Sequence, residues 1–281
     1  MPSPVNASNR QGRRYRRTRF ALALLAVVLV VYGLLAYLLL PVLWRHYEHQ
    51  KKLDGLPMVT ATAQGIPGDP INVGMVGGEK DILCAMRTAG WHAADPITWR
   101  SSLEISGSVI LDHPYPDAPV SPLYYSGRKQ DLAFELPVGK SADRRHHVRL
   151  WKVLESGEEG RPVWLGAATF DRSVGFSHDT GAITHHIAPD IDADRALIEA
   201  DLQNAGMISA RYQVTGIGPT VLGYNGEGDP YFTDGDVWIF RLVENCVKRT
   251  APPEILPNPP AVAFKDAIWK SAADLYRAST R

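Results

Sequence analysis

Residues 20 to 43 form an unbroken apolar run, FALALLAVVLVVYGLLAYLLLPVL, and no other feature constrains this chain as strongly. No charged side chain lies between Arg19 and Arg45. As a helix the run spans about 36 Å, which exceeds the roughly 30 Å hydrocarbon core of a bilayer. Tyr37 and Trp44 lie near its end, where amphipathic aromatic side chains favour the lipid–water boundary. The sequence therefore predicts one N-terminal transmembrane helix over residues 20–43.

A cleaved signal peptide is the competing interpretation of the same run. Signal peptides carry an apolar region of about 7–15 residues, followed directly by an Ala-x-Ala-like cleavage site. Here the run is longer, and the nearest such triplet, Ala61-Thr62-Ala63, begins 18 residues after Leu43. Paired arginines upstream also suggest a twin-arginine signal, but the apolar run is again too long. We therefore expect an uncleaved anchor.

The charged side chains are distributed unevenly around this anchor. Residues 1–19 hold six arginines and no acidic residue, whereas three basic residues, Arg45, Lys51 and Lys52, follow the run closely. By the positive-inside rule, residues 1–19 form a cytoplasmic Arg-rich tail and the rest of the chain faces outward, into the periplasm of a Gram-negative cell. That outward part carries 24 basic and 30 acidic side chains, a formal charge of −6, which argues against a nucleic-acid partner.

The outward-facing part resembles an α+β domain on a short connection. Residues 44–70 are polar and punctuated by Gly and Pro, which indicates a stalk. Residues 71–249 contain β-like runs and helical patterns without regular alternation, which predicts a mainly antiparallel sheet with a few packed helices. Residues 250–281 form a Pro-rich linker and an amphipathic helix, expected over 261–278. That helix either docks on the domain or meets a partner, and docking is the simpler interpretation.

Three helices are expected inside the domain. The first covers 79–89 and ends at Gly90, and the second covers 101–110. The third begins after Pro189 and ends at Gly206, with acidic residues in its first turn.

Cys84 and Cys246 are the two cysteines of the chain. An oxidising compartment allows them to form a disulfide, but their spacing does not establish that they are close. Two buried free thiols are an equal alternative. Since no CxxC motif occurs, a metal knuckle and a thioredoxin-type redox site are excluded.

The common catalytic motifs are absent, and histidine pairs stand out instead. The sequence contains no GxxxxGK[ST], GxGxxG, GxSxG or HExxH motif. Four of the nine histidines fall in two adjacent pairs, His146-His147 within RRHHVRLW and His185-His186 within THHIAPDIDADR. Because neighbouring side chains of a strand point to opposite faces, each pair is divided between two environments.

The first pair lies in a run that is apolar on both faces. Alternation places His147, Arg149 and Trp151 on one face and His146, Val148 and Leu150 on the other. Arg149 should therefore be buried and need a carboxylate partner, with Asp171, Asp190 or Asp192 expected. His185 or His186 is expected to approach this strand, with Asp190 or Asp192 nearby.

Three interpretations of these polar residues remain open. A structural network of bonded His, Arg and Asp side chains is the simplest. Forked hydrogen bonds from Arg128, Arg145 and Arg149 would instead suit a phosphate or carboxylate ligand, and two imidazoles with a carboxylate would suit a metal. As ligand-binding candidates we select Arg128, His146, His147, Arg149, His185, His186 and Asp192. We assign no catalytic residue, no metal site and no cofactor.

Several ordered motifs together resemble the LssY C-terminal domain family. They are INVGMVG, AGWHAADPIT, APVSPLYYSGRKQDLAFE, RRHHVRLW, PVWLGAATFD and THHIAPDIDADR, and they extend from about residue 71 to residue 208. The resemblance implies a bacterial membrane-associated protein of a family named for a type I secretion component. Related domains also occur attached to membrane phosphatase-like modules, of which this chain carries no sign. The family implies no established reaction.

Two functions from different classes follow as hypotheses. The first is a single-pass inner-membrane protein, N-terminus cytoplasmic, that presents an LssY-C-like periplasmic domain as an envelope- or secretion-associated binding module. Its partners would be the membrane and an envelope protein or an anionic ligand. The alternative is a hydrolase that acts on phosphorylated or lipid-linked envelope molecules through a His/Arg/Asp site.

Overall fold

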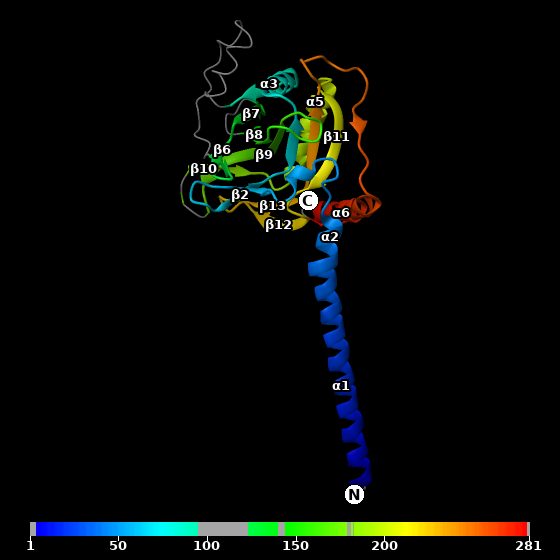
Figure 1. Ribbon diagram of the computed structural model, residues 1–281. Helices are drawn as coiled ribbons and strands as arrows, with labels where there is room; N and C mark the ends of the chain where they lie inside the picture. The colour runs from blue at the N-terminus through cyan, green and yellow to red at the C-terminus, as the bar shows by residue number, and fades with distance from the viewer. Residues whose placement is uncertain (1–3, 95–122, 140–143, 179–180, 182, 280–281) are drawn as a thin grey trace. The chain divides into compact units, whose positions relative to one another are not determined.

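The computed structural model describes residues 4–94, 123–139, 144–178, 181 and 183–279 (Figure 1). The chain divides into two compact units, Met1–Arg45 and His46–Arg281. Each unit is described separately below.

The first unit is helical throughout its described residues. Helix α1 (Pro4–Leu34) continues through a π-helical turn, η1 (Leu35–Leu39), into α2 (Leu40–Trp44). The π-turn directly precedes Pro41, which has no N–H to offer the preceding turn. The helix Tyr15–Trp44 is long and apolar enough to cross a membrane, and the mean hydropathy of an 18-residue window within it is 2.8. This helix fits a single-pass membrane protein, although a signal sequence near the N-terminus meets the same test.

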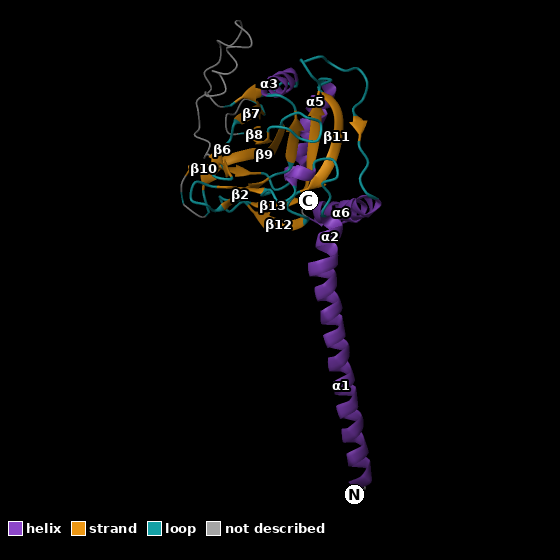
Figure 2. Ribbon diagram, viewed as in Figure 1, coloured by secondary structure: helices purple, strands orange, loops and turns teal. Residues whose placement is uncertain are grey.

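Within its described residues, the second unit is built around a sheet of nine strands, and Figure 2 shows the helices that pack beside it. Its order is β15-β11-β14-β3-β9-β8-β7-β4, and β10 pairs with β9 in addition. The strands are β3 (Val73–Val76), β4 (His92–Ala93), β7 (Leu132–Pro137), β8 (Arg145–Leu154), β9 (Val163–Phe176), β10 (Ile183–Ile187), β11 (Ile208–Thr215), β14 (Asp236–Leu242) and β15 (Glu254–Ile255). Among these strands, β14–β3 and β11–β15 pair in parallel and the other pairs are antiparallel. The predicted α+β class with a mainly antiparallel sheet is confirmed.

Two helices cover one face of this sheet. Helices α3 (Glu79–Thr88) and α5 (Ile191–Asn204) pack an apolar core with the side chains that β3, β8 and β14 direct toward them. Both helices end before a glycine with positive φ, Gly90 at 90° and Gly206 at 72°, as their sequences predict. The helix expected over 101–110 lies outside the described residues.

The opposite face is covered by the residues that we expected to form a stalk. Leu53 of the short helix η2 (Lys51–Leu53) is fully buried, and Met58 packs in the same core with Trp151 of β8. The smaller sheet on this side has the order β2-β1-β5-β6. Its strands are β1 (Val59–Ala61), β2 (Pro67–Pro70), β5 (Tyr124–Tyr125) and β6 (Arg128–Lys129). Polar, Gly/Pro-rich composition here marks turns within a packed layer, so the description of 44–70 as a stalk was wrong from His46 onward.

The C-terminal helix α6 (Pro260–Ser279) docks on the same unit. Val262 and Ala273 are buried, and Lys265 Nζ lies 2.5 Å from Asp236 Oδ2. The ring of Tyr276 contacts the ring of Phe232, and their centroids are 5.3 Å apart. Phe232 belongs to strand β13 (Pro230–Thr233), which pairs with β12 (Thr220–Tyr224). The docking interpretation of the C-terminal helix is the one that the structure supports.

Cys84 and Cys246 form a disulfide, so the alternative of two free thiols does not hold. Their Cα atoms are 6.0 Å apart, within the usual range for disulfides. The bond ties helix α3 to the segment after β14 across 162 residues of sequence. A closed loop of this length strongly restricts the unfolded chain.

Removing this disulfide should lower thermal stability. For the double variant Cys84→Ala/Cys246→Ala we expect a loss of about 3–5 kcal/mol, or about 10 °C in Tm, measured by calorimetry of the full chain in detergent. Reduction of the wild type should give a similar shift and leave the double variant unchanged. Stoichiometric labelling of two thiols in unreduced, denatured wild type would show this pairing to be wrong.

Candidate functional site

Strand β8 divides its histidine pair between the two faces of the sheet, as alternation predicts. Val148 and Leu150 lie in the core under the helices, and Trp151 lies in the core of the opposite face. His146 turns toward α5, where its Nδ1 lies 2.6 Å from Asp194 Oδ1. His147 turns to the opposite face together with Arg149. His147 and Arg149 therefore lie together on the face of the sheet opposite helices α3 and α5.

The second pair is divided in the same way by β10. His185 and His186 pair with Val174 and Ser173 of β9, so the two rings leave the strand in opposite directions. His185 Nδ1 lies 3.4 Å from Asp171 Oδ2. His186 Nδ1 lies 2.7 Å from a different carboxylate, Asp229 Oδ1. Each adjacent histidine pair thus supplies a single ring to the site around Asp171.

Asp171 is the common centre of this site. Its Oδ2 lies 3.2 Å from His147 Nδ1, 3.4 Å from His185 Nδ1 and 3.4 Å from Arg145 Nε. Burial by itself raises the pKa of Asp171, but the charge and hydrogen bond of His147 and the charges of His185 and Arg149 outweigh burial. They hold the pKa at about 2. Asp171 is therefore an ionised carboxylate that joins strands β8, β9 and β10.

Arg149 forms the second charged element of the site. Its Nη1 lies 3.5 Å from Asp69 Oδ2 and donates a hydrogen bond to His147 Nε2 at 3.1 Å. The pKa of Arg149 is lowered: burial is the largest cause, Asp69 and Asp171 act in the opposite direction, and Arg145 lowers it further. The carboxylates around this guanidinium thus compensate its buried charge only in part.

These side chains line a small open cavity between the central sheet and the layer of residues 46–70. Its volume is about 40 Å³, enough for a few water-sized groups and too small for a whole lipid or peptide. The lining residues are Thr62, Asp69, Leu123, His147, Arg149, Asp171, Thr184, His185, Ile187, Asn225, Gly226 and Glu227. Asp171 Oδ1 is buried and accepts no hydrogen bond from the described residues. The cavity thus joins the guanidinium of Arg149 with the carboxylates of Asp69, Asp171 and Glu227, and Asp171 Oδ1 is an acceptor that no described residue uses.

Three of the seven candidate residues line the cavity, and four lie elsewhere. Arg128 is exposed and pairs with Asp131, His146 pairs with Asp194, and His186 pairs with Asp229, as the ion pairs show. Asp192 accepts hydrogen bonds from the Thr233 hydroxyl at 2.6 Å and from Asp234 N at 2.8 Å, at the end of β13. Burial raises the pKa of Asp192, with Arg195 opposing and Asp234 adding to that effect.

The prediction of which carboxylates lie beside Arg149 was only partly correct. Asp171 contributes to its environment as expected, whereas Asp190 caps helix α5 through Ala193 N. The closest partner, Asp69, lies in the segment interpreted as a stalk, and Asn225 and Glu227 come from the β12–β13 hairpin. No local pattern distinguishes these three residues from ordinary turn residues. Their role depends on contacts between segments more than 70 residues apart in sequence.

The charge of Asp171 should make stability depend on pH in a defined range. A carboxyl whose pKa falls from about 4 unfolded to about 2 folded stabilises the protein fully above pH 4, and this stabilisation disappears as the pH falls toward 2. The free-energy difference between wild type and Asp171→Asn should therefore shrink by about 2–3 kcal/mol from pH 5 to pH 2 in denaturant titrations. Asp131→Asn is the control, and an unchanged difference for Asp171→Asn would contradict the assignment.

Comparison with known proteins gives one family. The chain matches the family described as LssY C-terminus over residues 53–237, which is more than half of its length. The match is wider at both ends than the range from about 71 to 208 indicated by the sequence motifs, and it includes Asp69, Asn225 and Glu227. No curated protein and no solved structure matches the chain.

Proposed function

Because the chain belongs to the LssY C-terminal family, we propose that it is a single-pass inner-membrane protein whose outward-facing domain binds a phosphate group in the Arg149–Asp171 cavity. In this proposal it acts as an envelope- or secretion-associated binding module. The cavity carries the proposal, since it joins buried charges of both signs with room for one small group.

Two observations support an outward-facing domain. The basic residues lie mainly before the apolar helix, which favours a cytoplasmic N-terminus. The disulfide between Cys84 and Cys246 belongs to an oxidising compartment, because cytosolic thiols are normally kept reduced. Charge asymmetry and disulfide are independent of each other, and both favour the periplasm of a Gram-negative cell.

A reporter fusion tests this location. Alkaline phosphatase joined after Arg281 leaves the whole domain intact and should be active in cells, since that enzyme requires an oxidising compartment for its disulfides. A β-galactosidase fusion at the same position should be inactive. The reverse result would place the domain in the cytoplasm and remove this part of the proposal.

The charges of the cavity support an anionic ligand. Burial is the largest cause of the lowered pKa of Arg149, and the charges of Asp69 and Asp171 offset it only in part. An anionic oxygen near the Arg149 guanidinium would offset the remaining cost of burying it. Asp171 Oδ1, in contrast, needs a donor.

A hydrogen phosphate group meets both requirements at once. Its anionic oxygens can accept from the Arg149 guanidinium, while the hydroxyl of the singly ionised group can donate to Asp171 Oδ1. A carboxylate offers no such hydroxyl near neutral pH, because its pKa is about 4. The small volume admits a phosphate group and leaves the remainder of the molecule that carries it outside. A phosphorylated envelope molecule is therefore the ligand class that we propose.

Calorimetric titration with inorganic phosphate tests the ligand. The full chain in detergent should bind phosphate, and Arg149→Lys should weaken binding at least about tenfold, because lysine loses the forked geometry. Arg128→Lys, an exposed arginine in an ion pair outside the cavity, is the matched control and should bind as the wild type does. Acetate in place of phosphate tests a carboxylate ligand.

Two results would contradict the proposal. One is wild type that binds neither phosphate nor a phosphomonoester. The other is Arg149→Lys that binds phosphate normally while melting at a lower temperature, which would favour a structural role for Arg149.

A hydrolase acting on the same phosphorylated molecules is the second candidate. It is favoured by the position of His185, whose Nδ1 faces Asp171 Oδ2 while its side chain lines the cavity, as in a carboxylate-oriented general base. His147 is less suited to this role, because its Nε2 already contacts Thr169 Oγ1 and Arg149 Nη1. Release of p-nitrophenol from p-nitrophenyl phosphate, lost in His185→Gln while phosphate binding persists, would favour the hydrolase over the binding module.

A further inference from the structure

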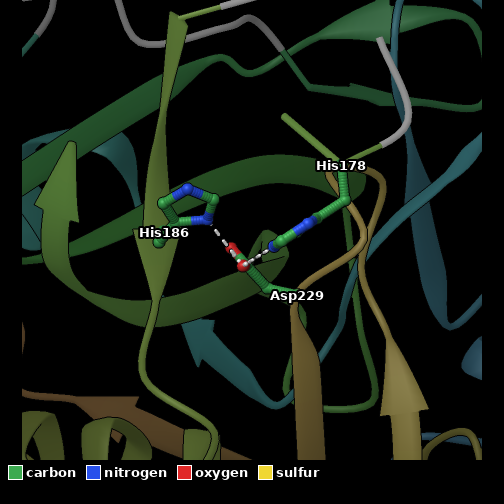
Figure 3. A group of neighbouring side chains, drawn as sticks. All are labelled: His178, His186 and Asp229. Carbon is green, nitrogen blue, oxygen red and sulfur yellow. Dashed lines mark hydrogen bonds and ion pairs between the residues drawn. The ribbon is translucent and has the colours of Figure 1, made fainter. Parts of the chain in front are cut away.

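A second polar cluster lies beside the cavity and contains His178, His186 and Asp229 (Figure 3). The three residues come from three segments: the loop after β9, strand β10, and the turn between β12 and β13. One nitrogen of each histidine and one carboxylate oxygen lie within 4.8 Å of one another. Figure 3 shows both imidazole rings directed at the carboxylate. From this geometry we infer a divalent transition-metal site, with zinc as the best-fitting ion.

The three ligand atoms are close enough to one another to share one metal ion. His186 Nδ1 lies 2.7 Å from Asp229 Oδ1, and His178 Nε2 lies 3.9 Å from the same oxygen. The second distance is too long for a hydrogen bond. In a tetrahedral zinc site, bonds of about 2.0–2.1 Å place neighbouring ligand atoms about 3.3 Å apart. The two distances lie on either side of that value, and changes of about 0.6 Å in each give the metal-bound geometry.

Asp229 is held in position as a metal-binding carboxylate would be. It is fully buried, and its Oδ2 accepts a hydrogen bond from Ile187 N at 3.0 Å. The backbone N–H of Asp229 donates to Asn225 Oδ1 at 2.8 Å. These bonds orient Oδ1 toward the two histidines. Such supporting bonds fix ligand orientation at protein metal sites.

The ring of His186 is also fixed. A Cβ atom on Gly175 of β9 would lie 2.5 Å from His186 Nε2, so the ring occupies the space that the missing side chain leaves. This contact on the Nε2 side leaves Nδ1 facing Asp229. For His186 to bind a metal through Nδ1, the proton that Nδ1 shares with Asp229 would move to Nε2, which leaves a neutral ring with its lone pair on Nδ1.

His178 completes the set from the solvent side. Its side chain is 65% exposed, and its backbone N–H donates to the carbonyl of Glu227 at 3.0 Å, next to the Asp229 turn. Two histidines, one carboxylate and an open side toward solvent are typical of zinc sites that keep a position for water or ligand. Asp229 supplies the negative charge that a divalent cation requires. Of the histidine pair on β10, this site uses His186, whereas His185 lines the Arg149–Asp171 cavity.

Metal binding can be measured on the full, untagged chain in detergent, treated first with a chelator. We expect one equivalent of Zn²⁺ to bind in competition with a chromophoric chelator. Co²⁺ should give the visible absorption of a tetrahedral complex. His178→Gln and His186→Gln should each weaken Zn²⁺ binding at least about tenfold.

The exposed position of His178 separates binding from folding. His178→Gln should melt as the wild type does without metal, so a loss of Zn²⁺ binding there cannot come from misfolding. His92→Gln removes another exposed histidine, on β4, and should bind Zn²⁺ normally. The inference is overturned by a wild type that binds no Zn²⁺, or by His178→Gln that binds it with unchanged affinity. It is also overturned if His185→Gln causes an equal loss, which would place the ion in the neighbouring cavity. Phosphate binding through Arg149 is a separate measurement, so either proposal can fail alone.

Discussion

The central sheet is covered on both faces, and for this reason the polar side chains of β8, β9 and β10 must find their partners inside the protein. Helices α3 and α5 cover one face, and residues 46–70 with the small sheet cover the other. A charged group taken out of water is costly unless it is paired. Arg149 and Asp171 are buried together on the second face, where the charge of each reduces the cost of the other. The polar site is thus a consequence of the two-sided packing.

The alternation of side chains along a strand then distributes the histidines. Each adjacent pair gives one ring to the site at Asp171 and one ring to another carboxylate, Asp194 or Asp229. A pair of neighbouring histidines therefore does not form one site with four nitrogen atoms. It connects two sites through the same strand. For β10 the result is the Arg149–Asp171 cavity, proposed to bind phosphate, on one side and the His178–His186–Asp229 cluster on the other, linked by Asn225.

Asn225 is the residue that ties these two sites to the layer covering the sheet. Its Nδ2 donates to Asp69 Oδ1 at 3.3 Å, and its Oδ1 accepts from Asp229 N at 2.8 Å. Asp69 in turn pairs with Arg149. Two hydrogen bonds and one ion pair therefore join the two sites through side chains that are buried in the described structure.

The parts of this protein that depend on local patterns could be predicted from its sequence. Hydrophobic length predicts the apolar helix, and glycine stops predict where α3 and α5 end. Strand period places His147, Arg149 and Trp151 on one face of β8. The α+β class and the family follow from the order of these patterns. Each of these features is set by residues that are close in the chain.

Other features were decided by the tertiary structure alone. The disulfide could not be predicted, because spacing along the chain does not give the distance between Cys84 and Cys246. Asp69 was hidden in a segment whose Gly and Pro content resembles a stalk, and Asp229 and His178 carry no motif. Charged side chains choose partners by distance in space and by burial, and neither is encoded by periodicity. By itself the sequence determined which faces the strands present, and only the folded chain decided which carboxylate each histidine meets.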